Sequence, residues 1–259
     1  MSIELIIVYG IISICLGLLP ALLIISNRFG FQKQLWFSWI LGGIFWLLAL
    51  LFRMPLLYLI QLNLREFNLV VLLSALLAGL FETLFRVVLI LGFTKYVADS
   101  KEKLMMAGLG WGMIEAVILH SIPVLMIMIT PTREQLELLE GYEWTLLFGG
   151  FERIMVEIFH LVMMTIVFYG LKKKLKDISQ SEPIADTFFT KDPNPVWLWI
   201  VIVMLLHFSF DFILVSLVYS VGVVLTYMLG FVFVGLLASY LTNRIKAYPL
   251  FPKEDKLKR

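Results

Sequence analysis

The stretch IIVYGIISICLGLLPALLII, residues 6–25, contains twenty residues without a single charge. About 20 apolar residues are enough for an α-helix to cross the hydrocarbon core of a bilayer. No basic segment precedes this stretch, and the apolar run 3–25 is longer than the core of a signal peptide. We therefore expect a retained membrane-spanning helix at the start of the chain.

Similar apolar runs follow along the rest of the chain. Hydrophobic residues make up 61% of the 259 residues and charged residues only 15%, and the mean hydropathy is +0.94. That composition leaves too little polar surface to cover a soluble globule, so it indicates an integral membrane protein. We predict an all-α protein with one polytopic membrane domain over 1–259. The seven predicted spans are 3–25, 35–61, 67–93, 104–129, 145–170, 195–217 and 219–241, the last two joined by a short connection around 218–221.

Basic residues predict the orientation of these spans. The connections at one end, together with the C-terminal tail, carry sixteen of the 21 Lys and Arg residues, whereas the other end carries Arg65 and Arg133. Lys and Arg favour the cytoplasmic side of a membrane. We therefore expect an external N-terminus, a cytoplasmic basic tail at 243–259 and a multi-pass location in a cell membrane. The lone cysteine, Cys15, excludes an internal disulfide.

Two connections are long enough to be interpreted separately. The acidic segment TREQLELLEGYEW, residues 132–144, predicts a short external surface helix. The segment DISQSEPIADTFFTKDPNPVW, residues 177–197, predicts a cytoplasmic loop, with Trp197 and Trp199 at the membrane interface. We expect no nucleic-acid partner, because the basic residues follow the membrane topology.

Ionisable side chains inside the predicted spans are the strongest functional signal. A charged residue at membrane depth costs at least about 2.5–3.5 kcal/mol on insertion scales, so each one is a candidate site residue. Counting about 1.5 Å per residue from each cytoplasmic flank places five of them in one layer near the middle of the membrane. They are Glu82, Arg86, Glu115, His160 and His207. A second group falls nearer the outer face: His120, Glu152, Arg153 and Asp211.

Spacing within the spans predicts two pairs. Glu82 and Arg86 are four residues apart, so they share a helix face and can form an ion pair. His207 and Asp211 have the same spacing, and a carboxylate one turn away can fix the tautomer of an imidazole.

Two further helix faces are notable. One face of the span 145–170 carries Arg153, Glu157 and His160. In the span 104–129, small residues that allow close helix approach lie beside a carboxylate. This stripe consists of Gly108, Trp111, Gly112 and Glu115.

Some ionisable residues have a purely structural interpretation. We expect Arg53 near the outer interface, with its guanidinium reaching the headgroups. We expect His120 to be interfacial rather than catalytic. Glu152 and Arg153 could either lock their helix to a neighbour or contribute to a site, and the sequence leaves both interpretations open.

Four segments occur in the order GLFETLFR (79–86), GLGWGMIEA (108–116), GGFERIMVEIFH (149–160) and LHFSFDF (206–212). Together they resemble the successive motifs of the YhfC-type intramembrane peptidases, relatives of the CAAX-protease and bacteriocin-processing (CPBP/Abi) superfamily. The resemblance covers 79–212 and predicts a peptidase core at 67–217. It implies a protease of the bacterial cytoplasmic membrane that hydrolyses peptide bonds of membrane-embedded or membrane-proximal substrates.

The resemblance also implies roles for individual residues. Glu82 would activate water with Arg86 as its partner, and His160, His207 and Asp211 would be the histidines and the acid of the later motifs. Glu115, Glu152, Arg153 and Glu157 would support them.

The chain departs from the family pattern at two positions. Thr83 follows Glu82 where the superfamily usually has a second glutamate, and Trp111 stands where YhfC-type sequences tend to carry histidine. Both departures favour a competing hypothesis, a catalytically inactive relative that binds membrane helices as a regulatory or immunity protein.

The chemistry of the residues is compatible with two more functions. A zinc ion could be held by His160 and His207 with Glu82 or Asp211, leaving one position open for water, although no cofactor is the simpler expectation. A proton-coupled transporter is the second of these functions, because buried Glu, Arg and His also form proton relays.

Overall fold

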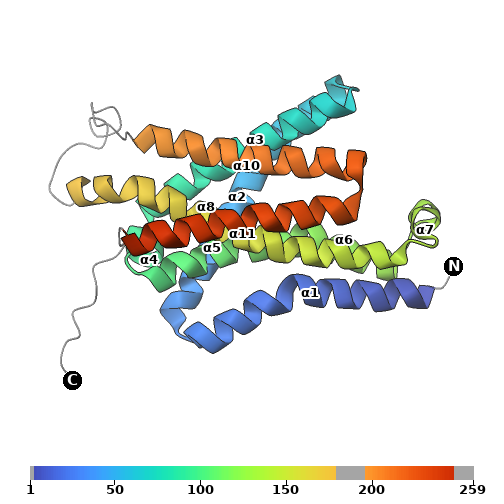
Figure 1. The fold of residues 1–259 in the computed structure, drawn as a ribbon, viewed down its shortest axis with the longest axis horizontal. Helices are drawn as coiled ribbons and strands as arrows, with labels where there is room; N and C mark the ends of the chain where they lie inside the picture. Colours follow the sequence, from blue (N-terminus) through green and yellow to red (C-terminus); the bar gives the residue numbers. More distant parts are fainter. Residues whose placement is uncertain (1–2, 179–195, 248–259) are drawn as a thin grey trace.

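The computed structural model describes residues 3–178 and 196–247, and every secondary-structure element in these residues is helical (Figure 1). Seven helices are long and apolar enough to cross a membrane, which makes the chain a multi-pass membrane protein. The spans are α1 (Ile3–Phe29), α2 (Lys33–Asn63), α3 (Phe67–Gly92), α5 (Lys101–Ala116) continued by η1 (Val117–Ser121) and α6 (Ile122–Ile129), α8 (Leu146–Ile178), α10 (Val196–Val221) and α11 (Val223–Ala247). Three short helices complete the fold: α4 (Thr94–Val97), α7 (Arg133–Leu139) and η2 (Glu143–Thr145).

All seven predicted spans are confirmed. The predicted surface helix is α7, which begins with a capping box formed by Thr132 and Gln135. The break between the last two spans lies at Gly222, just beyond the predicted 218–221, because the chain turns there at a φ of 89° that favours glycine. The helix α4 was not predicted. Most of the predicted loop 177–197 and the basic tail lie outside the described residues.

The helices pack as an antiparallel bundle in which α5 occupies the centre between α2 and α8. Helix α3 lies against α2 and α10, and α1 and α11 both pack on α8. Close packing depends on small residues: a Cβ on Gly110 would lie 1.9 Å from the carbonyl oxygen of Trp39, and one on Gly42 would lie 2.0 Å from that of Ala107. The α2–α5 contact is therefore a backbone-to-backbone contact, typical of helices in membranes.

The fourth span contains a π-helical turn, η1 (Val117–Ser121), between α5 and α6. Pro123 follows at the start of α6 and has no N–H to bond the carbonyl of Leu119, so the regular ladder is interrupted here. His120, within this turn, is buried and lies 3.0 Å from the Ser13 hydroxyl of α1. His120 therefore packs against α1, and its predicted position near the membrane interface stays a prediction.

The bundle has two distinct ends (Figure 1). The N-terminus, α7 and the α10–α11 connection lie together at one end, which we call the N-terminal end. The α1–α2 connection, α4 and the end of α11 lie at the other, which we call the basic end because most of the predicted cytoplasmic Lys and Arg residues belong to it. Which end faces the cytoplasm stays a prediction from the charge distribution.

Candidate functional site

The Glu82 carboxylate of α3 lies inside the bundle and accepts hydrogen bonds from three helices. Arg53 of α2 donates to Oε1 at 3.1 Å, Arg86 of α3 donates to Oε2 at 3.2 Å, and the Trp111 indole of α5 donates to Oε2 at 3.0 Å. The Glu82 side chain is only 3% exposed. Two guanidinium groups and an indole therefore replace water around this carboxylate. Without such donors, burying its negative charge in a low-dielectric interior would cost too much free energy.

Arg86 is the centre of the site. Its side chain is fully buried and donates from Nη2 to Nδ1 of His160 at 2.5 Å and from Nη1 to Nδ1 of His207 at 3.3 Å, in addition to its bond with Glu82. The guanidinium carbon also lies 4.4 Å from the centre of the Trp111 ring, within cation–π distance. One side chain of α3 thus joins α5, α8 and α10, as only the forked guanidinium can.

These contacts determine the tautomers of both histidines. A guanidinium is a donor only, so Nδ1 of His160 and Nδ1 of His207 must both be acceptors without a proton. Each ring is therefore neutral and carries its proton on Nε2. Neither histidine has a free lone pair, so both can donate a hydrogen bond and neither can act as a base while Arg86 is in place.

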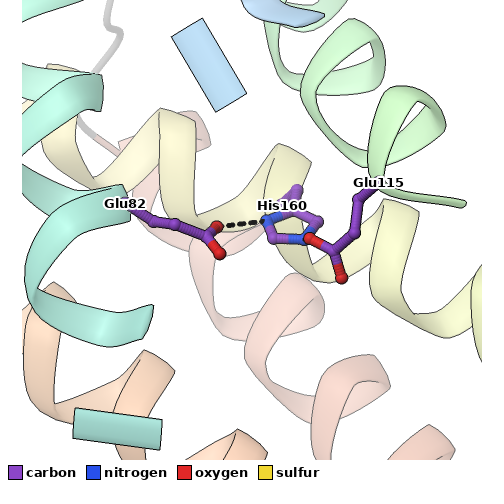
Figure 2. Close-up of side chains that lie close together, drawn as sticks. All are labelled: Glu82, Glu115 and His160. Atoms are coloured by element: carbon purple, nitrogen blue, oxygen red, sulfur yellow. Dashed lines mark ion pairs between the residues drawn. The ribbon is translucent and has the colours of Figure 1, made fainter. Parts of the chain in front are cut away.

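Glu115 of α5 supplies a second carboxylate to the cluster. The Trp46 indole donates to its Oε2 at 2.9 Å and Arg153 donates to its Oε1 at 3.4 Å. Nε2 of His160 lies 2.8 Å from Oε2, although its N–H is not aligned with that oxygen as in a hydrogen bond. Figure 2 shows the His160 ring between the carboxylates of Glu82 and Glu115.

The two carboxylates and His160 are close enough to share one small ligand. One oxygen of Glu82, one oxygen of Glu115 and one nitrogen of His160 all lie within 4.8 Å of one another. Two oxygens hydrogen-bonded to the same water molecule at about 2.8 Å each are about 4.5 Å apart. The spacing therefore fits a single bound water.

His207 lies beside His160, with 5.6 Å between the centres of the two rings. Its Nε2 is 3.4 Å from Oδ2 of Asp211 and 3.7 Å from Oε2 of Glu82. The Phe159 ring lies edge-on to His207, 5.5 Å between ring centres, and stacks on Phe210 at 4.1 Å. The imidazole is thus held by Arg86 on one edge and by aromatic packing, while Asp211, 34% exposed, is the most accessible acid of the cluster.

A cavity of about 370 Å³ contains these groups. Its polar lining is Arg53, Ser74, Glu82, Glu115, Glu152, Arg153, His160, His207 and Asp211. The apolar lining comes from η1 and from the halves of α2, α3, α8 and α10 nearer the N-terminal end, for example Leu57, Val70 and Val215. Farther along α3 toward the basic end, Leu89 and Ile90 are fully buried and do not line the cavity. The cavity therefore leads from the Glu82 layer toward the N-terminal end.

A second polar layer lies between the cluster and the N-terminal end. Arg153 pairs with Glu152 as well as with Glu115, and the Tyr227 hydroxyl of α11 donates to Glu152 at 3.2 Å. Glu152 and Arg153 therefore both lock α8 to its neighbours and line the cavity, so the two sequence interpretations are compatible. Glu157 does not join them: its Cα, Cβ and Cγ pack against Gly112, and its buried Oε1 has no hydrogen-bond partner in the described residues.

The structure places the residues of the predicted layer next to one another, and their depth in a membrane stays a prediction. Glu82, Arg86, Glu115, His160 and His207 meet in one cluster, with the predicted pairs Glu82–Arg86 and His207–Asp211 formed. The prediction for Arg53 is wrong, because its guanidinium is buried against Glu82 instead of reaching headgroups.

Three participating aromatic residues were missed by sequence reasoning: Trp46, Tyr227 and the donor role of Trp111. Trp46 and Arg53 are seven residues apart on one face of α2, which is a signal that could have identified both. Thr83 is buried, and its hydroxyl has no hydrogen-bond partner in the described residues.

The predicted zinc ligands do not fit a metal in this arrangement. His160 and His207 both use Nδ1 to accept from Arg86, so their Nε2 atoms carry protons and cannot coordinate a cation. Three guanidinium groups, from Arg53, Arg86 and Arg153, lie around the two glutamates and would repel one. The arrangement instead favours chemistry that uses hydrogen-bond donors and carboxylates.

Comparison with protein-family models, with curated proteins and with solved structures gave no match. The resemblance to the YhfC-type peptidases therefore stays a sequence-based prediction.

Proposed function

We propose that this protein is an intramembrane hydrolase that cleaves peptide bonds of membrane-embedded or membrane-proximal substrates. The observation that carries the proposal is the pair of carboxylates, Glu82 and Glu115, whose oxygens lie within 4.8 Å of each other and of His160 in a cavity at membrane depth. A water molecule held between two carboxylates has both an orientation and a proton acceptor, which are the requirements for hydrolysis.

We assign the base to a carboxylate, because the histidine lone pairs are occupied by Arg86. Glu82 accepts three good donors, two of them cationic, which stabilises its negative charge and weakens it as a proton acceptor. Glu115 accepts from the Trp46 indole at 2.9 Å but from only one arginine, at the longer distance of 3.4 Å, and its side chain is 12% exposed against 3% for Glu82. We therefore assign Glu115 as the base and Glu82 as the residue that orients the water. The sequence prediction had Glu82 as the residue that activates water.

The two histidines are suited to stabilise the oxyanion that forms during peptide hydrolysis. With their protons on Nε2, His160 and His207 can each donate to the oxygen of a carbonyl as it becomes negative. The proposed reaction begins when the bound water attacks the carbonyl carbon and gives its proton to Glu115. The same proton then passes to the leaving amine as the C–N bond breaks, so the carboxylate is regenerated.

The cavity also supports a peptide substrate. Its walls toward the N-terminal end are apolar, and Leu119 and Val215 on these walls are 47% and 38% exposed at the surface of the bundle. An extended segment of a membrane protein could enter between apolar walls while its backbone reaches the polar cluster. We expect the cut to lie in the half of the membrane nearer the N-terminal end.

Two other functions compete with this proposal. An inactive, helix-binding relative is favoured by the three donors that already bind the Glu82 carboxylate without a substrate. A proton-coupled transporter would use the same buried acids as a relay.

The test is to incorporate the purified protein into lipid vesicles with a panel of single-span membrane peptides and to analyse the products by mass spectrometry. We expect wild type to cut some peptides, and Glu115→Gln, Glu82→Gln and His207→Ala to lose at least about a hundredfold in rate. Glu137→Gln on the exposed helix α7 is the matched control and should retain full rate. Cleavage that persists in all three site variants would reject the site, and no cleavage across a broad panel would favour the inactive relative.

A further inference from the structure

A second pocket, unconnected with the carboxylate cluster, lies at the basic end. It has a volume of about 380 Å³ and is formed by the first turns of α2, the short helix α4 and the first turn of α5. Its lining is Lys33, Gln34, Phe37, Lys95, Tyr96 and Lys103. Three of these six residues are lysines that come from three different helices, so the fold gathers positive charge at one point.

The walls of this pocket are fixed by hydrogen bonds. The buried Ser38 hydroxyl donates to the carbonyl oxygen of Tyr96 at 2.5 Å, which ties α2 to α4. Lys103 donates to the carbonyl oxygen of Lys95 at 3.0 Å and pairs with Asp99 at 2.7 Å, which ties α5 to the same helix. The lysines are therefore presented by a rigid frame, and a rigid frame reduces the entropy lost when a ligand binds.

Among the residues that the structure describes, only one of the three lysines of the pocket has an acidic partner. Asp99 balances Lys103, whereas the ammonium groups of Lys33 and Lys95 form no ion pair with the residues that the structure describes. The Tyr96 hydroxyl likewise has no hydrogen-bond partner among those residues. Two free ammonium groups and a phenol in one pocket are a donor set for the oxygens of an anionic phosphate ester.

The level of the pocket identifies the source of that phosphate. Lys33 is the first residue of α2 and Lys103 the third of α5, so both lie within about 5 Å of the ends of spans, where headgroups begin. Phe37 and Tyr96, 43% and 46% exposed, stand in edge-to-face contact at 5.3 Å on the same pocket. Aromatic residues at this level contact the upper part of the acyl chains.

We infer that this pocket binds the phosphate-containing headgroup of an anionic phospholipid, with Lys33 and Lys95 contacting the phosphate and Phe37 and Tyr96 contacting the first acyl carbons. Basic pockets between spans on the positively charged side of a membrane protein have the chemistry for such headgroups. The inference does not depend on the proposed hydrolase, because no residue of the pocket belongs to the carboxylate cluster.

The test compares binding of phosphatidylglycerol and phosphatidylcholine with identical chains to the delipidated full-length protein, by native mass spectrometry. The variant is Lys33→Gln with Lys95→Gln. The matched control is Arg28→Gln with Lys101→Gln, which removes the same charge at the same end from residues that do not line the pocket. A third arm adds glycerol 3-phosphate as a soluble phosphate without acyl chains.

We expect wild type and the control to bind phosphatidylglycerol at least about tenfold more tightly than the pocket variant, because only the pocket variant loses the two ammonium groups that contact the phosphate. Phosphatidylcholine should bind all three proteins equally. Equal loss of phosphatidylglycerol binding in the pocket variant and the control would overturn the inference, since charge anywhere at this end would then suffice. Displacement of the lipid by an equal concentration of glycerol 3-phosphate would also overturn it, in favour of a site for free phosphate esters.

Discussion

Replacing Arg86 by lysine should weaken the whole bundle, because one guanidinium joins three helices to α3 and its neighbour Glu82. Arg86 donates to Glu82 at 3.2 Å, to His160 at 2.5 Å and to His207 at 3.3 Å. A lysine keeps the charge, but its three N–H donors lie on one nitrogen and cannot reach partners spread over the two Nη atoms of the guanidinium, so we expect it to retain one of these three bonds and to lose two.

The magnitude follows from the two lost bonds. Hydrogen bonds to charged groups contribute about 1.5–3 kcal/mol each in soluble proteins and about 0.6 kcal/mol on average between membrane helices. Two lost bonds therefore cost between about 1 and 6 kcal/mol, and we expect about 3 kcal/mol because every partner is nearly fully buried. The free energy of unfolding is measured by titrating micelle-bound protein with sodium dodecyl sulfate and following helicity.

The control is Arg133→Lys on α7, where Nε of an arginine that is 92% exposed bonds Glu137. This substitution should change the free energy of unfolding by less than about 0.5 kcal/mol. If Arg86→Lys is no more destabilising than Arg133→Lys, Arg86 is not the centre of the network, and the assignment of the histidine tautomers fails with it.

Four further outcomes are expected. Solid-state ¹⁵N NMR should find His160 and His207 neutral with the proton on Nε2, and a proton on Nδ1 of either ring would contradict the contacts of Arg86. Trp111→Phe should destabilise the protein by about 1 kcal/mol, because the hydrogen bond from the indole to Glu82 is lost. Trp111→Leu should cost about 1 kcal/mol more, because the cation–π contact with Arg86 is lost too. Equal stability of the two variants would refute that contact. Gly110→Ala should cost about 2 kcal/mol or more, since its Cβ meets a backbone carbonyl, whereas Gly235→Ala, with nothing within 4 Å, should be nearly neutral. Peptide cleavage should be insensitive to chelators. Loss of activity that zinc restores would contradict a site that works through hydrogen-bond donors and carboxylates.

The spans could be predicted because hydropathy and helix length strongly restrict what a chain can do in a bilayer. The common depth of Glu82, His160 and His207 was also accessible, since a fixed rise per residue converts position in a helix into depth. The same conversion from residue position to depth placed Arg53 too near the outer interface. Its helix α2 has 31 residues, more than an upright span needs, so distance from the first residue overestimates depth along the membrane normal.

Lateral contacts could not be predicted in the same way. Trp46 and Trp111 have the composition of ordinary apolar filler, and only the packing of α2 and α5 against α3 and α8 turns their indole N–H groups toward carboxylates. The role of Arg86 as a donor to both histidines likewise depends on the rotation of three helices about their axes, which one sequence does not fix.

The most direct test of the central claim, that Glu82 and Glu115 activate a water molecule, is single-turnover peptide cleavage in lipid vesicles containing ¹⁸O-labelled water. Wild type should place one ¹⁸O atom in the new carboxyl terminus, and Glu115→Gln and Glu82→Gln should each slow its appearance at least about a hundredfold. Labelled product formed at the wild-type rate by both variants, or product without ¹⁸O, would contradict the account.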